Sequence, residues 1–194
     1  MGLNPSEFNK VNVTDTCGVW NILSSQLLYV TAKSAGCNFC CTKFVHYECL
    51  YKPRNKHKPE DIELQNRLKK ALNDDEQFTS YNLSLEDLQE VEILRQRKNL
   101  GKGELSSIAF AKKINQAFLT DDVKARKLAE SSIERGLVQT TPHLLGWLFF
   151  ANYLSDSDLK IIIEQHKQNN QPLEKYFLIM YERALDYRSK QNIS

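Results

Sequence analysis

The sequence contains few of the residues that interrupt regular structure: of 194 residues, 7 are glycine and 5 are proline. This scarcity excludes a collagen-like chain and a low-complexity chain. Long apolar runs are also absent, because no stretch approaches the roughly 18 consecutive apolar residues of a membrane-spanning helix. The first residues lack a basic region followed by an apolar run, the pattern of a signal peptide. We therefore expect a cytoplasmic protein with no membrane partner.

The cysteines match neither a disulfide framework nor a zinc finger. There are 5 of them, an odd number, and the Cys37-x-x-Cys40 spacing is not followed by a second Cys/His pair at a finger-like distance. Reduced thiols are therefore expected, as is usual in a cytoplasm.

The charges of the chain nearly cancel, since 26 Lys and Arg and 24 Asp and Glu leave a formal charge of +2. This balance excludes a polybasic nucleic-acid-binding tail and a strongly acidic chain. It does not describe where the charges lie, so a locally charged site is compatible with the composition. Hydrophobic residues account for 41%, which is enough for a packed core.

Short β-rich segments alternate with helical patterns through most of the chain. The expected strands cover residues 11–15, 38–42, 78–83, 117–120 and 137–140. The expected helices cover residues 18–35, 43–51, 59–72, 84–94, 104–114, 123–135 and 142–153. Strands separated by helices predict an α/β fold, a three-layer α/β/α sandwich with a central, mostly parallel sheet.

The last part of the chain is helical only. Ser155 and Asp156 are typical of a helix start, and Pro172 opens a long helix that reaches about residue 188. We therefore expect an α/β domain at residues 1–153 and a C-terminal two-helix extension at residues 154–194. The α/β domain includes a charged helical insert at about residues 52–83.

Acidic residues follow two of the expected strands at the point where each strand ends. Asp15 follows the first strand, and Asp121 and Asp122 follow the fourth. Glu104 comes directly after the break at Gly101-Lys102-Gly103, and Glu48 lies on the helix after the second strand. Ligands of open parallel sheets bind at the carboxyl ends of the strands. Carboxylates converging there would suit Mg²⁺ or Mn²⁺, which can activate water and neutralise charge on a phosphodiester.

Each of these acids also has a purely structural interpretation. A carboxylate at a strand end or helix start commonly caps the helix or complements its dipole, and Glu104 suits that role in particular. Only the joint pattern favours a metal site.

Two clusters of basic residues adjoin the acids in the sequence. The first includes Arg54, Lys56 and Lys58, just past Glu48, and the second ends at Lys102, just before Glu104. Contacts to phosphates supply most of the non-specific affinity for nucleic acid, so both clusters are compatible with an RNA groove. A solvated loop and a charged helix face explain them equally well.

Four motifs, in order along residues 10 to 145, carry a resemblance to a known family. Val13-Thr14-Asp15-Thr16 resembles the opening Asp-Thr signature of the PIN-domain ribonucleases, and Glu48 matches the second acid of that family. The segment 103–111 resembles the Gly-Glu-x-x-x-Ile-Ala-x-Ala pattern of one PIN subgroup. The segment 119–126 resembles the fourth-strand motif, and the C-terminal helices are similar to those of bacterial PIN-like proteins.

The resemblance implies a metal-dependent endoribonuclease that uses Mg²⁺ or Mn²⁺ and has RNA as its partner. It implies Asp15, Glu104 and Asp122 as direct or water-bridged ligands, with Asp121 as the alternative to Asp122 because the motif aligns either way. Glu48 would assist as a more distant acid.

The same resemblance implies further roles and partners. Thr16 or Thr120 would hydrogen-bond a carboxylate or the scissile phosphate. Many members are toxins of toxin–antitoxin pairs (the VapC type) and dimerise, which implies an antitoxin protein and a homodimer.

The sequence departs from the family at Cys17, where members usually carry Asn or Ser, and in its long charged insert. The alternative interpretation is therefore a catalytically degraded PIN-like scaffold that binds RNA or a protein partner. An α/β regulatory module with another ligand at the same edge is a third possibility, although the Gly101-Lys102-Gly103 break lacks the spacing of a nucleotide-binding loop.

Overall fold

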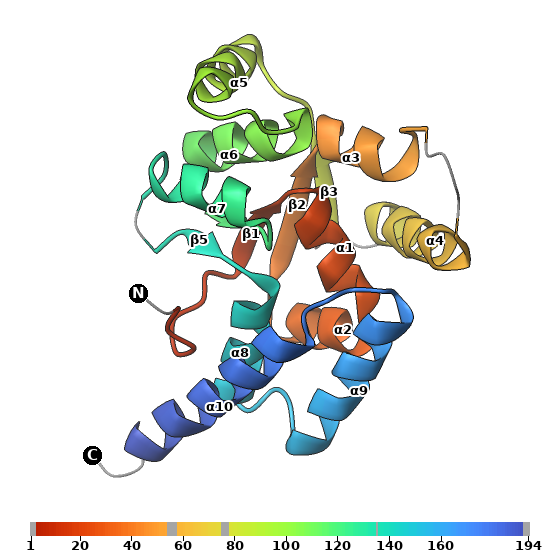
Figure 1. The fold of residues 1–194 in the computed structure, drawn as a ribbon, viewed down its shortest axis with the longest axis vertical. Helices are drawn as coiled ribbons and strands as arrows, with labels where there is room; N and C mark the ends of the chain where they lie inside the picture. Colours follow the sequence, from red (N-terminus) through yellow and green to blue (C-terminus); the bar gives the residue numbers. More distant parts are fainter. Residues whose placement is uncertain (1–2, 54–57, 75–77, 135, 192–194) are drawn as a thin grey trace.

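A computed structural model describes residues 3–53, 58–74, 78–134 and 136–191 of the chain. These residues contain a sheet of five strands, all parallel, in the order β3-β2-β1-β4-β5 (Figure 1). The strands are β1 (Val11–Thr14), β2 (Asn38–Thr42), β3 (Phe78–Tyr81), β4 (Ala117–Leu119) and β5 (Val138–Gln139). The expected α/β fold with a central parallel sheet is confirmed.

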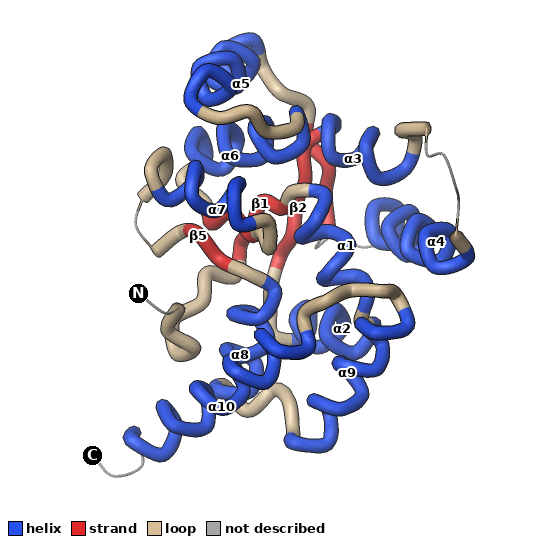
Figure 2. Tube along the Cα trace, viewed as in Figure 1, coloured by secondary structure: helices blue, strands red, loops and turns tan. Residues whose placement is uncertain are grey.

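Helices cover both faces of this sheet and give three layers (Figure 2). They are α1 (Thr16–Ser24), α2 (Gln26–Ser34), α3 (Lys43–Leu50), α4 (Pro59–Asp74), α5 (Leu85–Arg97), α6 (Lys102–Ile114), α7 (Val123–Glu130), α8 (Thr141–Phe150), α9 (Asp156–Gln168) and α10 (Glu174–Gln191). Within the described ranges, no helix combines the length and the apolar character needed to cross a bilayer.

The alternation of side chains along each strand creates two separate cores. Successive strand residues point to opposite faces of a sheet, so neighbours in sequence enter different cores. Phe39 and Cys41 of β2 pack with α1, α2, α4 and α8, whereas Cys40 between them packs with α5, α6 and α7. β4 follows the same rule, because Phe118 and Leu119 enter opposite cores.

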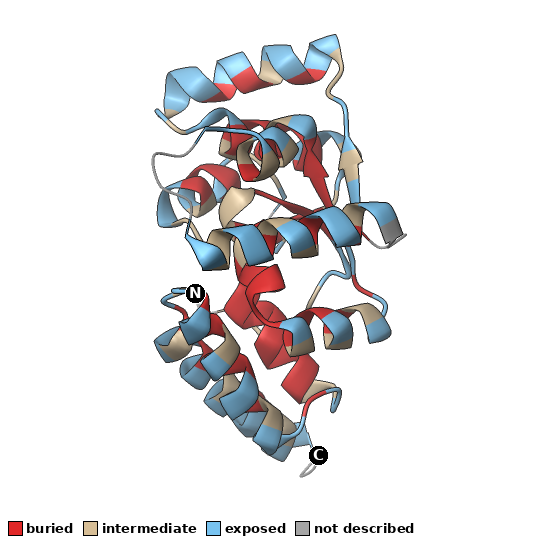
Figure 3. Cartoon of the chain, turned by 90° about the vertical axis from the view of Figure 1, so that its right-hand side faces the viewer, coloured by how far each residue is buried: buried red, intermediate tan, exposed pale blue. Residues whose placement is uncertain are grey.

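The last two helices extend the first of these cores. α8 is apolar all round and is buried from Thr141 to Phe149, as expected of a helix covered on every side (Figure 3). α10 packs on α8 and α9 packs on α2. Ile162 of α9 and Phe177 of α10 are fully buried in the core that also contains Ile22 of α1.

Two segments differ from their expected form. Residues 18–35, expected as one helix, form α1 and α2, because Ser25 leaves the helical conformation. Its hydroxyl accepts a hydrogen bond from the Leu28 amide and donates one to Gln165 Oε1 of α9, a tertiary contact with no sequence signal. The helix expected at residues 123–135 is shorter, because α7 ends at Glu130 and Ser131 is its C-cap.

Candidate functional site

The strand order places a ligand crevice between β1 and β4. In the order β3-β2-β1-β4-β5 the chain builds outward from β1 to β3 and then returns to the other side of β1 with β4. Open parallel sheets bind ligands at such a switch point, outside the carboxyl ends of the strands. Asp15 follows β1 directly, and Thr120, Asp121 and Asp122 follow β4. The sheet therefore brings together the acids that the sequence places at the ends of these two strands.

Asp15 is the buried centre of this group, with no exposed surface. Its Oδ1 accepts a hydrogen bond of 2.8 Å from the Gly18 amide, which makes it the N-cap of α1, and its Oδ2 accepts one of 2.5 Å from the Thr120 hydroxyl. Burial raises the pKa of Asp15 to about 7, and the charges of Asp121 and Glu104 act in the same direction against the two hydrogen bonds. Burial therefore favours the protonated form of Asp15 more than it would for an exposed aspartate.

Asp121 is held by donors on both of its oxygens. The Thr141 amide donates to Oδ1 at 3.0 Å. The Thr141 hydroxyl donates to Oδ2 at 2.6 Å, and Asn21 Nδ2 donates to the same atom at 2.7 Å. Burial raises the pKa of Asp121, and these hydrogen bonds and the charge of Arg126 oppose that rise. Asp121 thereby ties β4 to α1 and to the start of α8.

Asp122 differs from its neighbour because only one of its oxygens is occupied. Its Oδ1 caps α7 by accepting hydrogen bonds of 2.7 Å from the amides of Lys124 and Ala125. Its Oδ2 has no hydrogen-bond partner within the described part of the chain. Asp122 therefore caps α7 with Oδ1, as acids at helix starts commonly do, and its Oδ2 remains available to a ligand.

Glu104 lies in the first turn of α6 and carries an orphaned oxygen. Its Oε2 is buried, and no described atom forms a hydrogen bond with it. The carboxylate folds back over Gly101, where an added Cβ would lie only 2.5 Å from Oε2. A buried oxygen without a donor costs free energy, and such a group commonly faces an absent ion or water.

Glu48 joins the site through Thr16 and Gly103. The Thr16 hydroxyl donates a hydrogen bond of 2.7 Å to Glu48 Oε2, which links α3 to α1. Gly103 of α6 leaves the space for this pair, because an added Cβ would overlap Glu48 Oε2 and lie 3.3 Å from Thr16 Oγ1. Glycine is therefore favoured at position 103 for a steric reason, because α1, α3 and α6 meet there around the Glu48 carboxylate.

From the sequence, Cys17 is notable only as a departure from the family. In the structure, Cys17 lies among the acids. Burial raises the pKa of its thiol well above the ordinary value, and the charges of Asp15, Asp121 and Asp122 raise it further. The thiol is therefore held neutral.

Sequence reasoning missed two residues of this site, Asn21 and Thr141. Asn21 is nearly fully buried on α1, and its Nδ2 donates to Asp121 Oδ2 at 2.7 Å and to Cys17 Sγ at 3.5 Å. A polar residue inside the apolar pattern of residues 19–23 was the signal that could have revealed Asn21. Thr141 gave no such signal, because a threonine before Pro142 fits an ordinary helix start.

Of the four predicted basic residues, the structure describes Lys58 and Lys102. Lys102 begins α6 next to the acids, and its Nζ lies 5.9 Å from the centre of the Phe44 ring. Lys58 is exposed at the start of α4. Arg54 and Lys56 lie outside the described residues.

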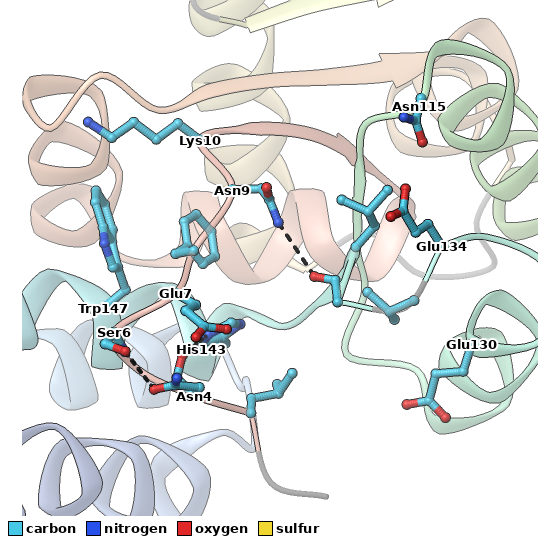
Figure 4. Close-up of a pocket in the computed structure, with 15 residues that line it drawn as sticks. Asn4, Ser6, Glu7, Asn9, Lys10, Asn115, Glu130, Glu134, His143 and Trp147 are labelled. Atoms are coloured by element: carbon cyan, nitrogen blue, oxygen red, sulfur yellow. Dashed lines mark hydrogen bonds between the residues drawn. The ribbon is translucent and has the colours of Figure 1, made fainter. Parts of the chain in front are cut away.

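A cavity of about 1040 Å³ lies at the opposite edge of the sheet (Figure 4). It is lined by Asn9 and Lys10 before β1, by Asn115 before β4 and by Leu137 before β5, so it opens at the amino ends of the strands. None of the predicted site residues lines it. This cavity is therefore separate from the acidic site.

The acids fit a divalent cation by their chemistry, although they do not form a ready-made site. Among the described residues, no group of three or more His, Cys, Asp or Glu side chains is arranged to hold a metal ion. The donors are nevertheless of the right kind, because hard carboxylate oxygens suit Mg²⁺ and Mn²⁺. The orphaned Glu104 Oε2 and the like charges around Asp15 are features that a cation would compensate.

Comparison with protein-family models, with curated proteins and with solved structures finds no match to this chain. The resemblance to the PIN-domain ribonucleases therefore rests on the four motifs alone.

Proposed function

We propose that this chain is a metal-dependent endoribonuclease that hydrolyses RNA phosphodiester bonds at the carboxyl edge of the sheet. One observation carries the proposal: the sheet brings the buried Asp15 together with Asp121 and Asp122 at the switch point, and the charges of Asp121 and Glu104 both act on Asp15. Carboxylates this close repel each other, and a divalent cation would relieve that repulsion. Glu104 Oε2 and Asp122 Oδ2 have no hydrogen-bond partner in the described residues, which supports the same conclusion.

Asp15, Glu104 and Asp122 would hold the cation. Asp122 Oδ2 and Glu104 Oε2 have no hydrogen-bond partner in the described ranges, and each oxygen of Asp15 accepts only one hydrogen bond, which leaves a lone pair for a cation. Asp121 accepts three hydrogen bonds, two of them at Oδ2. Asp121 is therefore assigned a positioning role. When bound, Mg²⁺ or Mn²⁺ lowers the pKa of water and neutralises charge that develops on the phosphate.

The protein's own residues prepare the site for this chemistry. Thr120 orients the Asp15 carboxylate, because its hydroxyl fixes Oδ2 while the Gly18 amide fixes Oδ1. The Thr16 hydroxyl fixes Glu48 in the same way at the junction of α1, α3 and α6. Lys102, at the start of α6, supplies a cation for a substrate phosphate.

A second candidate function is favoured by a specific observation. The described acids form no ready metal-binding group, and a neutral Cys17 thiol lies among them. A catalytically degraded PIN-like scaffold that binds RNA or a protein partner would show both features. The toxin role, the antitoxin partner, the homodimer and the cytoplasmic location remain predictions of the sequence.

Cleavage of a mixed panel of RNAs separates the two candidates. The wild-type protein is expected to cleave at least one RNA with Mg²⁺ or Mn²⁺ and not with EDTA, and Asp15→Asn is expected to abolish that cleavage. Asp186→Asn, which changes an exposed carboxylate on α10, is the matched control and should cleave like the wild type. Cleavage that survives Asp15→Asn contradicts the proposal, and absence of cleavage under every metal favours the scaffold.

A further inference from the structure

A second cavity, of about 420 Å³, opens beside Asp121 between α7 and α10. We call it the α7–α10 cavity. Its lining includes Asp121, which belongs to the acidic site, Arg126 of α7, and Tyr176, Ile179 and Arg183 of α10. It therefore reaches from Asp121 of the acidic site to α10.

The two arginines of the α7–α10 cavity are available to bind an anion. Within the described part of the chain, no hydrogen bond or ion pair joins Arg126 or Arg183 to a carboxylate, whereas Arg67 and Arg95 each form an ion pair within their own helix. A guanidinium group matches the geometry of a phosphate and can bind it through two hydrogen bonds.

Two acidic residues, Asp121 and Glu130, also line this cavity. Asp121 already accepts three hydrogen bonds, and Arg126 is close enough to lower its pKa. Glu130 lies at the far end of α7, roughly 12 Å along the helix axis from Asp122, and also lines the larger cavity.

The remaining wall of the α7–α10 cavity is aromatic and apolar. Tyr176 is 55% exposed and Ile179 is 37% exposed, although both line the cavity. A base can stack on a tyrosine ring, and such stacking tolerates any base sequence. The volume lies at the small end of the usual range for ligand sites, about 300–1,000 Å³, which suits one nucleotide and not a duplex.

We infer that the α7–α10 cavity binds one nucleotide of a single-stranded RNA, next to the bond that is cleaved. Its phosphate binds Arg126 and Arg183, and its base packs against Tyr176 and Ile179. This inference rests on the proposed function and names its substrate as single-stranded. It also gives the C-terminal extension a role, because α10 supplies half of the subsite.

Binding of a short fluorescein-labelled single-stranded RNA tests this inference, measured by fluorescence anisotropy in Ca²⁺ buffer with the RNA checked for integrity. Arg126→Ala and Arg183→Ala are each expected to weaken binding by about tenfold, the effect of losing one charge-assisted hydrogen bond. Each should also lower the slope of log K against log salt by about 0.7, as expected for one lost contact to a single strand. Lys160→Ala, which removes an exposed positive charge on α9, is the control of equal charge.

The inference is overturned by absence of binding by the wild type, by an equal loss in Lys160→Ala, or by equal competition by a duplex of the same sequence. Equal competition by a free mononucleotide also overturns it, since the ligand would then be a nucleotide and not an RNA strand. The test is independent of cleavage. RNA that binds through the arginines without being cleaved in Mg²⁺ or Mn²⁺ would contradict the proposed function alone, and cleavage that is insensitive to both arginines would contradict the subsite alone.

Discussion

The hydroxyl of Thr120, at the end of β4, donates a hydrogen bond of 2.5 Å to Oδ2 of Asp15, at the end of β1. Because β1 and β4 are neighbours on either side of the switch point, this bond closes the crevice at its base. It also stabilises the ionised form of Asp15 against the burial that raises its pKa to about 7. Thr120 therefore controls the charge of the central carboxylate.

Thr120→Val tests this control directly. Loss of the donated hydrogen bond raises the pKa of Asp15 further, so a smaller fraction of the carboxylate is ionised at neutral pH. Cleavage at pH 7 is expected to fall by roughly tenfold, the cost of about 1.4 kcal/mol, and to recover as the pH rises. The pH–rate profiles of wild type, Thr120→Val and Thr120→Ser measure this change in cleavage rate with pH. Thr120→Ser keeps the hydroxyl and should keep the wild-type profile. If the rising limb of the Thr120→Val profile lies at the same pH as in the wild type, Thr120 does not control the charge of Asp15.

Asp15→Asn should stabilise the metal-free protein at alkaline pH. The pKa of Asp15 rises from 3.8 to about 7 on folding, so the folded state favours the protonated carboxyl. The stability linked to this group is complete below pH 3.8 and is lost as the pH rises through 7. At pH 8 the ionised wild type is therefore expected to be less stable than Asp15→Asn by about 2–4 kcal/mol.

Urea unfolding in EDTA at pH 4 and pH 8 measures this difference. Asp186→Asn, an exposed carboxylate paired with Lys190, should change the free energy of unfolding by less than about 0.5 kcal/mol at both pH values. If Asp15→Asn lowers the free energy of unfolding by the same amount at pH 4 and pH 8, Asp15 serves only as the cap of α1.

Gly103→Ala should disrupt the contact of α6 with Glu48. The added methyl group overlaps Glu48 Oε2 and presses on Thr16 Oγ1, so we expect a loss of about 1–3 kcal/mol in the free energy of unfolding. Truncation of the clashing side chain in Gly103→Ala/Glu48→Ala should recover at least half of that loss. The double-mutant cycle measures the coupling, and additive effects of the two substitutions would contradict the contact.

The thiol of Cys17 should react slowly with Ellman's reagent although it is partly exposed. Burial and the neighbouring carboxylates raise its pKa, and only the thiolate is nucleophilic. In the native protein at pH 8, the progress curves of wild type and Cys17→Ser should coincide, whereas denaturant should release five and four thiols respectively. A fast-reacting thiol that disappears in Cys17→Ser contradicts the acidic environment.

Much of the fold could be predicted from the sequence because its local signals agree with its tertiary packing. The helix starts expected at residue 84 and at Ser155 are capping boxes in the structure, and the five expected strands are all present. The break at Ser25 could not be predicted, because the hydrogen bond to Gln165 joins residues 140 positions apart. Sheet order likewise depends on long-range pairing and not on local pattern.

The candidate site could be predicted only as a set of acids. Asp15, Asp121 and Asp122 could be placed at one edge of the sheet, because the carboxyl ends of parallel strands meet there. The division of roles between Asp121 and Asp122 could not be predicted, because it depends on Asn21 and Thr141, which reach Asp121 from other elements. The arginines of α7 and α10 were missed because they are separated by 57 positions, from 126 to 183, and join one cavity only in the fold.

Calorimetric titration of Mn²⁺ into the wild-type protein and into Glu104→Gln tests the central claim most directly, because Gln keeps the shape of the side chain and removes its charge. The wild type is expected to bind Mn²⁺ at one site, and Glu104→Gln is expected to weaken this binding by about tenfold or more because a ligand is lost. Asp186→Asn should bind like the wild type. No binding by the wild type, or equal binding by Glu104→Gln, would contradict a metal centre at the carboxyl ends of β1 and β4.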